Sequence, residues 1–256
     1  MVTVLEGYTR AVNTLKEAGI ENAAAEADIL FEEAVGKRRL ALQPDFELTD
    51  DVAHNLQAFA QKRATHYPLQ YICGTWPFLN TEIIVGEGVL IPRADTEIVA
   101  ETAIELIAQK HEPQILDLCS GSGAIAMAIK TDVPDANITA VELSGDAYKY
   151  LLLNAKHYIT TVQADVFTYQ NEIADAGLHM IVANPPYIRT DEMPTLEADL
   201  AFEPRMALCS GDTGVEFYEH IASAYASKLR CGGYMVFEIG YQQAERVSAI
   251  LRKNGF

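Results

Sequence analysis

The sequence is poor in basic residues, with 19 Lys and Arg against 36 Asp and Glu and a net charge of −17. A chain this acidic repels phosphate backbones, which argues against a nucleic-acid substrate and against direct nucleic-acid binding. The excess of carboxylates favours a basic or neutral partner, and it also confers solubility.

Cysteine and long apolar runs are scarce as well. The four cysteines, at positions 73, 119, 209 and 231, form no C-x-x-C pair, and the six histidines have no ligand spacing. This pattern is typical of reduced thiols rather than of a disulfide framework or a metal site. The apolar runs are far shorter than a membrane span, and the N-terminus has no signal pattern. We therefore expect a cytoplasmic protein that does not enter a membrane.

Apolar residues are abundant and make up 49% of the 256 residues, enough to build the core of one large domain or two smaller ones. Residues 1–72 have helical periodicity. An alanine-rich stretch over 22–35 ends before Gly36, and the stretch after Thr49 starts with two aspartates, which suit a helix N-terminus. We expect residues 1–72 to form a small helical bundle.

The pattern changes over residues 73–92, where glycine, proline and β-branched residues replace the helical period. Apolar runs on both sides of a polar turn at Asn80 and Thr81 predict a β-hairpin linker. From residue 93 to 256, β-prone runs alternate with helical stretches, which predicts an α/β domain with a doubly wound parallel sheet. The expected strands are 114–119, 137–143, 159–164, 178–183 and 234–239, and the last two helices are 215–230 and 242–253.

The segment DLCSGSG, residues 117–123, lies where the first strand of this sheet passes into a helix. Gly121 and Gly123 let the backbone approach a ligand, and ligands of open α/β sheets bind at this carboxyl edge. The segment is not the dinucleotide fingerprint G-x-G-x-x-G, because position 119 is cysteine and position 126 is alanine.

Three acids, Asp117, Glu142 and Asp165, stand at the ends of three successive predicted strands. A carboxylate at position 117 disfavours a pyrophosphate and favours a cation, and S-adenosylmethionine carries a sulfonium and an ammonium group but no phosphate. Glu142 can bind the ribose hydroxyls, and Asp165 can accept a hydrogen bond from the adenine amino group, with Val166 against the ring. The predicted cofactor-binding residues are Asp117, Cys119, Ser120, Gly121, Ser122, Gly123, Glu142, Asp165, Val166 and Asn184.

The turn Asn184-Pro185-Pro186-Tyr187 follows the fourth strand and lies at the same edge. A planar amide or base nitrogen is a poor nucleophile because its lone pair is delocalised. The Asn184 side-chain oxygen and the Pro185 carbonyl can accept its two N–H groups, and the prolines keep these acceptors in place. Tyr187 can stack on the planar group. We assign catalysis to Asn184, Pro185 and Tyr187, and substrate binding to all four residues.

The catalytic half resembles Rossmann-like class I methyltransferases that use S-adenosylmethionine. The chain as a whole resembles the PrmC/HemK family of release-factor glutamine methyltransferases. NPPYI at 184–188 also occurs in adenine and guanine amino-methyltransferases. PLQYICGTWPFLNTEIIVGEGVLIPRADTE at 68–97 resembles the linker of this family, and FEPRMALCSGDTGVEFYEHI at 202–221 resembles the segment after its active-site loop.

The resemblance implies that the substrate is the side-chain amide nitrogen of the glutamine in the Gly-Gly-Gln motif of class I peptide-chain release factors. It also implies that residues 1–72 contribute to docking that protein. We expect the enzyme to be a monomer, with residues 93–256 forming the methyltransferase domain.

The sequence departs from the family pattern at four points. Cys119 stands at a family glycine, so we expect a backbone there that does not demand glycine. Ala94 replaces a proline, and Glu142 replaces the commoner aspartate. The family normally continues beyond residue 256 with two more strands. We therefore expect about five parallel strands, with one sheet edge incomplete or covered by a neighbouring chain.

Two alternative functions stay open at this point: an amino-methyltransferase acting on a nucleic-acid base, and a non-catalytic protein that binds a translation factor. The low basic content and residues 68–97 argue against the first. The intact turn at 184–187 argues against the second. A dinucleotide dehydrogenase conflicts with the glycine pattern.

Overall fold

The computed structural model describes residues 2–196 and 198–256, and the chain divides into two compact units. The helical unit comprises Met1–Gly74 together with Ala198–Phe202. The catalytic unit comprises Thr75–Glu197 and Glu203–Phe256. The chain therefore contributes one short segment after the Asn-Pro-Pro-Tyr turn, Ala198–Phe202, to the helical unit, and the residues from Glu203 onward belong to the catalytic unit again.

Local signals in the sequence set the helix ends of the helical unit. Thr3 and Glu6 form a reciprocal capping box at the start of the first helix, and Thr49 caps the third. Gly36 ends the second helix in the left-handed conformation, with φ of 71°. The elements are β1 (Val2–Thr3), α1 (Val4–Glu17), α2 (Ala23–Val35), η1 (Arg39–Ala41), β2 (Glu47–Leu48), α3 (Asp50–Arg63), α4 (Leu69–Cys73) and η4 (Ala198–Phe202).

The helical unit has its own core, in which Leu15, Leu30, Phe31 and Leu56 are fully buried. Asp199 of η4 forms ion pairs with Arg63 at 3.0 Å and with His66 at 3.1 Å. These contacts join the short segment Ala198–Phe202 to the end of α3 and the turn that follows it.

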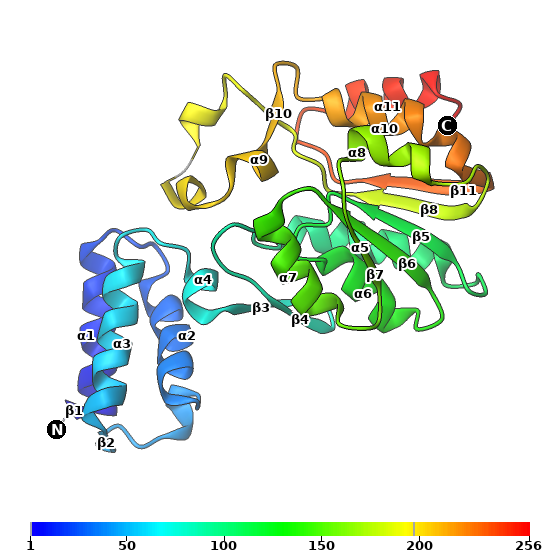
Figure 1. Ribbon diagram of the computed structural model, residues 1–256. Coiled ribbons are helices and arrows are strands. Elements are labelled where there is room, and N and C mark those ends of the chain that lie inside the picture. Colours follow the sequence, from blue (N-terminus) through cyan, green and yellow to red (C-terminus); the bar gives the residue numbers. More distant parts are fainter. Residues whose placement is uncertain (1, 197) are drawn as a thin grey trace. The chain divides into compact units, whose positions relative to one another are not determined.

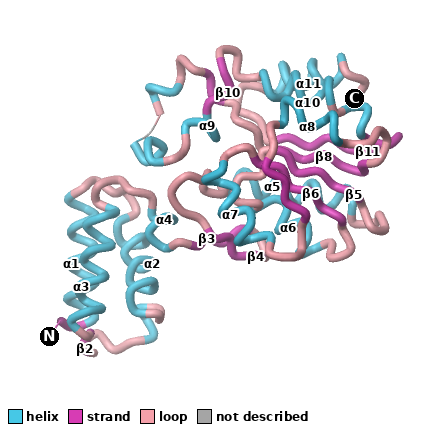
Figure 2. The backbone as a smooth tube through the Cα atoms, in the orientation of Figure 1, coloured by secondary structure: helices cyan, strands magenta, loops and turns pink. Residues whose placement is uncertain are grey.

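The catalytic unit opens with an antiparallel hairpin of β3 (Thr75–Phe78) and β4 (Thr81–Ile84). Its strands appear in magenta in Figure 2. The elements that follow are α5 (Ala94–Ile107), β5 (Gln114–Leu118), α6 (Ala124–Asp132), β6 (Asn137–Glu142), α7 (Gly145–Ala155), β7 (Thr160–Gln163), α8 (Val166–Tyr169), η2 (Gln170–Glu172), β8 (Leu178–Ala183), β9 (Ile188–Arg189), η3 (Met193–Thr195), α9 (Arg205–Leu208), β10 (Cys209–Gly211), α10 (Glu216–Ala224), η5 (Ala226–Lys228), β11 (Leu229–Phe237) and α11 (Ala244–Lys253).

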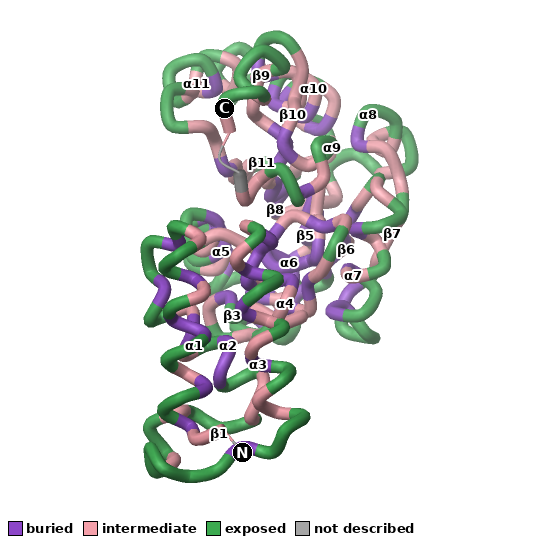
Figure 3. Tube along the Cα trace, turned by 90° about the vertical axis from the view of Figure 1, so that its left-hand side faces the viewer, coloured by how far each residue is buried: buried purple, intermediate pink, exposed green. Residues whose placement is uncertain are grey.

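The main sheet has the strand order β11-β8-β5-β6-β7, and all its pairs are parallel. This confirms the expected doubly wound sheet of five parallel strands. Helices α5, α6 and α7 cover one face, and α8, α10 and α11 cover the other (Figure 1). The central strands β5 and β8 are buried (Figure 3), as expected for a parallel sheet between two helical layers.

The strand register determines which side chains meet at the carboxyl edge. Leu118 pairs with Val141 and with Ala183, and Ala183 pairs with Phe237. The residues that follow these four positions therefore come out of the sheet side by side. The strands β5, β6 and β7 follow one another toward one edge of the sheet, and the chain then crosses back to place β8 on the other side of β5. Ligands bind at this change of strand order in such folds.

Two predicted boundaries were wrong. The last strand, expected over 234–239, starts at Leu229, because the chain pairs with β8 from that residue and bulges at Gly232, where φ is 71°. It ends at Phe237, which leaves Glu238 beyond the strand. The helix expected over 215–230 stops at Ala224, where the chain tightens into a 3-10 turn before it enters β11. Within the described residues, no helix is long and apolar enough to cross a membrane.

Candidate active site

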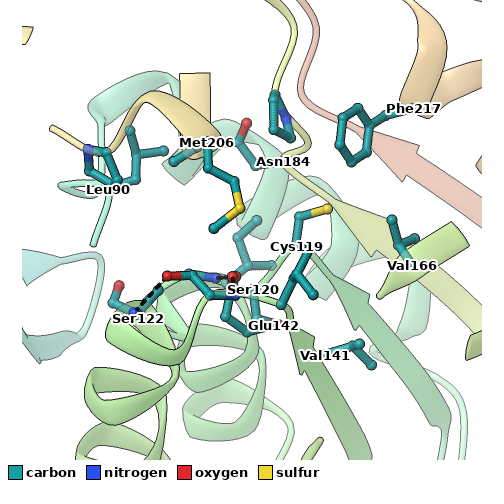
Figure 4. Close-up of a pocket in the computed structure, with 18 of the residues that line it drawn as sticks. Leu90, Cys119, Ser120, Ser122, Val141, Glu142, Val166, Asn184, Met206 and Phe217 are labelled. Atoms are coloured by element: carbon teal, nitrogen blue, oxygen red, sulfur yellow. Dashed lines mark hydrogen bonds between the residues drawn. The ribbon is translucent and has the colours of Figure 1, made fainter. Parts of the chain in front are cut away.

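A cavity of about 280 Å³ lies at the carboxyl edge of the sheet (Figure 4). Most of its lining is apolar, with fewer polar groups, as is usual for cofactor sites. Nine of the residues predicted for the site line it: Cys119, Ser120, Gly121, Ser122, Glu142, Asp165, Val166, Asn184 and Pro186.

Four other predicted residues are not part of the cavity lining. Asp117 is fully buried at the end of β5. Gly123 is the N-cap of α6, where φ is 83° and an added Cβ would lie 2.7 Å from Leu151 Cδ1, so both the backbone and the packing favour glycine. Pro185 is buried within the turn. The Tyr187 hydroxyl donates to a carboxylate that lies outside the lining.

The loop after β5 has three residues with positive φ: Cys119 at 57°, Gly121 at 56° and Gly123 at 83°. The expectation that Cys119 avoids a glycine-like backbone was therefore wrong. Ser120 is still paired with β6, since its N–H donates to the Val141 carbonyl at 3.0 Å, and the chain then turns, with the Gly123 N–H donating to the Ser120 carbonyl at 2.8 Å. A non-glycine residue in the left-handed region costs on the order of 1 kcal/mol.

Glu142 is held by the backbone at the end of β6. Its Oε2 accepts the Gly121 N–H at 2.8 Å, and its Oε1 accepts the Ser144 N–H at 2.7 Å. Burial raises the pKa of Glu142, and these two N–H groups partly oppose that rise. Each oxygen keeps a second lone pair that can accept a ribose hydroxyl.

The cavity has an acidic electrostatic character. Burial raises the pKa of Asp117 to about 7, and the nearby charge of Glu142 adds to this rise. Burial also raises the pKa of the Cys119 thiol well above its ordinary value, and the charges of Glu142 and Asp165 add to that rise. Neither Asp117 oxygen has a hydrogen-bond partner among the described residues. Among the described residues that line the cavity, none is Lys, Arg or His. Such a site fits a cationic cofactor such as S-adenosylmethionine and disfavours a phosphate.

Asn184 belongs to a hydrogen-bonded network that the sequence did not reveal. Its Nδ2 donates to Thr96 Oγ1 at 3.3 Å, and the Thr96 hydroxyl donates to Glu238 Oε2 at 2.5 Å. The Tyr187 hydroxyl donates to Glu238 Oε1 at 3.4 Å. Glu238 could have been found by the rule that selected Glu142, since both acids stand at the carboxyl end of a strand, Glu142 as its last residue and Glu238 directly after it. Thr96 gave no such signal.

The sequence also failed to indicate the apolar walls of the cavity. Glu203 accepts the Ile91 N–H at 3.0 Å and forms an ion pair with Arg93, so it joins the segment before α5 to the segment around α9. Both segments contribute to the lining. The lining residues that were not predicted include Leu90, Pro92, Ile125, Leu143, Phe167, Met206 and Phe217.

No group of three or more His, Cys, Asp or Glu within residues 2–196 and 198–256 is placed to hold a metal ion.

Comparisons with known proteins identify both halves of the chain. The family described as PrmC N-terminal domain matches residues 6–74, and the methyltransferase small domain matches residues 93–204. A release factor glutamine methyltransferase of Fusobacterium nucleatum is 35% identical over 98% of this chain and 73% of its own length. One from Geobacter sulfurreducens is 35% identical over 94% of this chain and 86% of its own. A third, from Thermodesulfovibrio yellowstonii, is 39% identical over 82% of this chain and 77% of its own.

Among solved structures, a ribosomal protein L11 methylase from Lactobacillus delbrueckii gives a TM-score of 0.46 at 18% identity, covering 70% of this chain and 79% of its own. The relatives match nearly the whole chain, and the methyltransferase match includes the glycine loop and the Asn-Pro-Pro-Tyr turn. The protein is therefore a methyltransferase with S-adenosylmethionine as its cofactor, and the chain belongs to the release factor glutamine methyltransferase family.

Proposed function

We propose that this enzyme methylates the side-chain amide nitrogen of the glutamine in the Gly-Gly-Gln motif of class I peptide-chain release factors. The observation that carries the proposal is the orientation of Asn184. Its Nδ2 is occupied by Thr96, so its Oδ1 is the atom left to accept a hydrogen bond from a substrate. A primary amide brings two N–H donors to such a site.

The second acceptor is the carbonyl of Pro185. Among the described residues, no group donates a hydrogen bond to this carbonyl. The turn is fixed from outside by Gln243, whose Nε2 donates to the Tyr187 carbonyl at 3.0 Å. Two acceptors on a rigid turn can hold both N–H groups of the amide, so that its nitrogen lone pair faces the methyl donor with little reorganisation.

S-adenosylmethionine, when bound, supplies a methyl group on a positively charged sulfur. Glu142 would hold the ribose hydroxyls, and Asp165 and Val166 would hold the adenine. The acids around Cys119 favour the positive charge of the donor. The substrate nitrogen becomes acidic once it is alkylated, so its proton can pass to solvent and the scheme needs no strong base on the enzyme.

We assign docking of the release factor to the helical unit. Support comes from η4, which begins eleven residues after Tyr187 and belongs to the helical unit. Arg63, which is almost fully buried, binds Glu26 at 2.6 Å and Asp199 at 3.0 Å, so this segment is anchored by a charged core. The segment that follows the active-site turn thus runs into Ala198–Phe202, which is part of the helical unit. A protein that binds the helical unit therefore binds the unit to which this segment is anchored.

The test is methyl transfer from S-adenosylmethionine to an intact class I release factor, followed by mass spectrometry of its Gly-Gly-Gln peptide. The expected result is a single added methyl on the glutamine, and none when that glutamine is replaced by alanine. Transfer to RNA or DNA in place of the factor would support the base-directed alternative, and the absence of any transfer would overturn the proposal.

The docking assignment is tested separately with a chain that lacks residues 1–72. Every predicted cofactor residue lies at Asp117 or beyond, so calorimetry should show that the shortened chain still binds S-adenosylmethionine. Its kcat/KM on the whole factor should fall. Equal kcat/KM for the two chains would refute the docking role.

A further inference from the structure

Glu238 is a buried acid outside the cavity lining, and the roles described above do not require its charge. It is 8% exposed, and it follows β11 at the position next to the Asn-Pro-Pro-Tyr turn. Its backbone N–H donates to the Ala183 carbonyl at 3.0 Å, so its place beside Asn184 is fixed by the sheet register. Burial raises its pKa, which means that the ionised side chain reduces the stability of the fold.

Both carboxylate oxygens accept hydroxyl protons, one from Thr96 and one from Tyr187. A carboxylate can only accept hydrogen bonds when ionised, and a threonine hydroxyl has a single proton. Because that proton is directed to Glu238, Thr96 Oγ1 can only accept in its contact with Asn184. The amide group of Asn184 must then present Nδ2 to Thr96 and leave Oδ1 for the substrate.

We propose that Glu238 is a positioning residue for methyl transfer, which acts through the Thr96 hydroxyl to fix the side-chain amide of Asn184 with its oxygen available to the acceptor nitrogen. The inference rests on the function proposed above, because only an N–H-bearing acceptor requires this orientation. Without the carboxylate, the Thr96 proton can point to Asn184 Oδ1, and the reversed amide then presents N–H groups to a substrate that also carries N–H groups.

The same carboxylate also holds the far end of the turn. Tyr187 keeps its proton because burial, followed by the charge of Glu238, raises its pKa to about 12. Glu238 is therefore connected to the residues on both sides of the two prolines. It is hydrogen-bonded directly to Tyr187, and through Thr96 to Asn184.

A double-mutant cycle in the full chain tests the proposal. Glu238→Met keeps a similar volume and removes the acceptor, and Thr96→Val keeps the shape and removes the hydroxyl. Each should lower kcat on a release factor by about a hundredfold, the scale of losing one oriented group at a reacting centre. The double variant should be no slower than either single variant, since both changes break one relay.

Three further measurements separate positioning from a general loss of structure. The Kd of S-adenosylmethionine should stay within about twofold in Glu238→Met, because this residue does not line the cavity. Thr96→Ser, which keeps the hydroxyl, should recover most of the turnover lost in Thr96→Val. Glu245→Met, at an exposed acid in the first turn of α11, is the matched control and should not alter kcat.

The outcomes distinguish this inference from the proposed function. A wild-type enzyme that does not methylate the factor overturns the function. A wild-type enzyme that does so, with kcat unchanged in Glu238→Met or with losses that multiply in the double variant, overturns the relay alone. If Glu238→Met does not fold, the same cycle is measured with Glu238→Leu, which also removes both acceptor oxygens, and multiplying losses there also refute the relay.

Discussion

Replacing Asp117 by asparagine should stabilise the ligand-free protein, and only above a certain pH. The carboxylate is fully buried, and burial raises its pKa from 3.8 to about 7. The folded chain thus holds this proton more tightly than the unfolded chain. Well below pH 4 both states are protonated and the charge has no cost. As pH rises, the unfolded state ionises first, so stability falls between about pH 4 and pH 7 and the full cost remains above that range.

The size of the effect follows from the pKa shift. A difference of about 3 pKa units corresponds to roughly 4 kcal/mol at about 1.4 kcal/mol per unit. Asparagine cannot ionise, and like protonated aspartic acid it leaves a neutral polar group buried. Asp117→Asn should therefore raise the free energy of unfolding by about 2–4 kcal/mol near pH 8.5 and by only about 1 kcal/mol near pH 4.5.

Urea unfolding of the ligand-free chain at these two pH values checks the prediction. Asp146→Asn is the control, since that side chain is 69% exposed. S-adenosylmethionine should stabilise the wild type more than Asp117→Asn, because a bound cation favours the ionised carboxylate. An equal gain at both pH values, or a loss near pH 8.5, would show that the buried charge is not the cause.

Three further outcomes are expected. Asn184→Ala should lower single-turnover rates by about a hundredfold or more while calorimetry shows cofactor binding largely intact, because the acceptor for the substrate N–H is lost; near-normal turnover would contradict its role. Glu142→Ala should weaken S-adenosylmethionine binding about ten- to a hundredfold through lost ribose hydrogen bonds, and an unchanged Kd would place the ribose elsewhere. Gly123→Ala should lower the free energy of unfolding by about 1–3 kcal/mol, because φ is 83° there and the added Cβ would lie 2.7 Å from Leu151 Cδ1; denaturation at or above wild-type stability would exclude this strain.

Sequence reasoning predicted the part of the site that depends on strand ends. Parallel strands place their carboxyl ends at one edge, so Glu142, Asp165 and Asn184 were found from the position of each after an apolar run, and all three line the cavity. The depth of Asp117 could not be read in the same way. Whether an acid at a strand end faces a ligand or the core depends on the helix packed over it, which only the tertiary structure defines.

The supporting network was out of reach for a related reason. Thr96 and Glu238 are 142 residues apart, and their contact depends on the order β11-β8-β5, which places the last strand beside the fourth. The backbone at Cys119 was misjudged because a side chain does not reveal φ. A family pattern with glycine at that position was a direct signal of a left-handed conformation, and the cysteine keeps that conformation at a cost.

The absence of Lys, Arg and His from the described lining of the cavity has a consequence for competition inside a cell. ATP shares its adenosine half with S-adenosylmethionine, so the adenine and ribose contacts alone cannot separate the two. Its phosphates would enter a cavity whose fixed charges are Glu142 and Asp165, with no counter-charge to receive them. Selection of the methyl donor over abundant nucleotides therefore depends on repulsion, and millimolar ATP should leave methyl transfer unaffected.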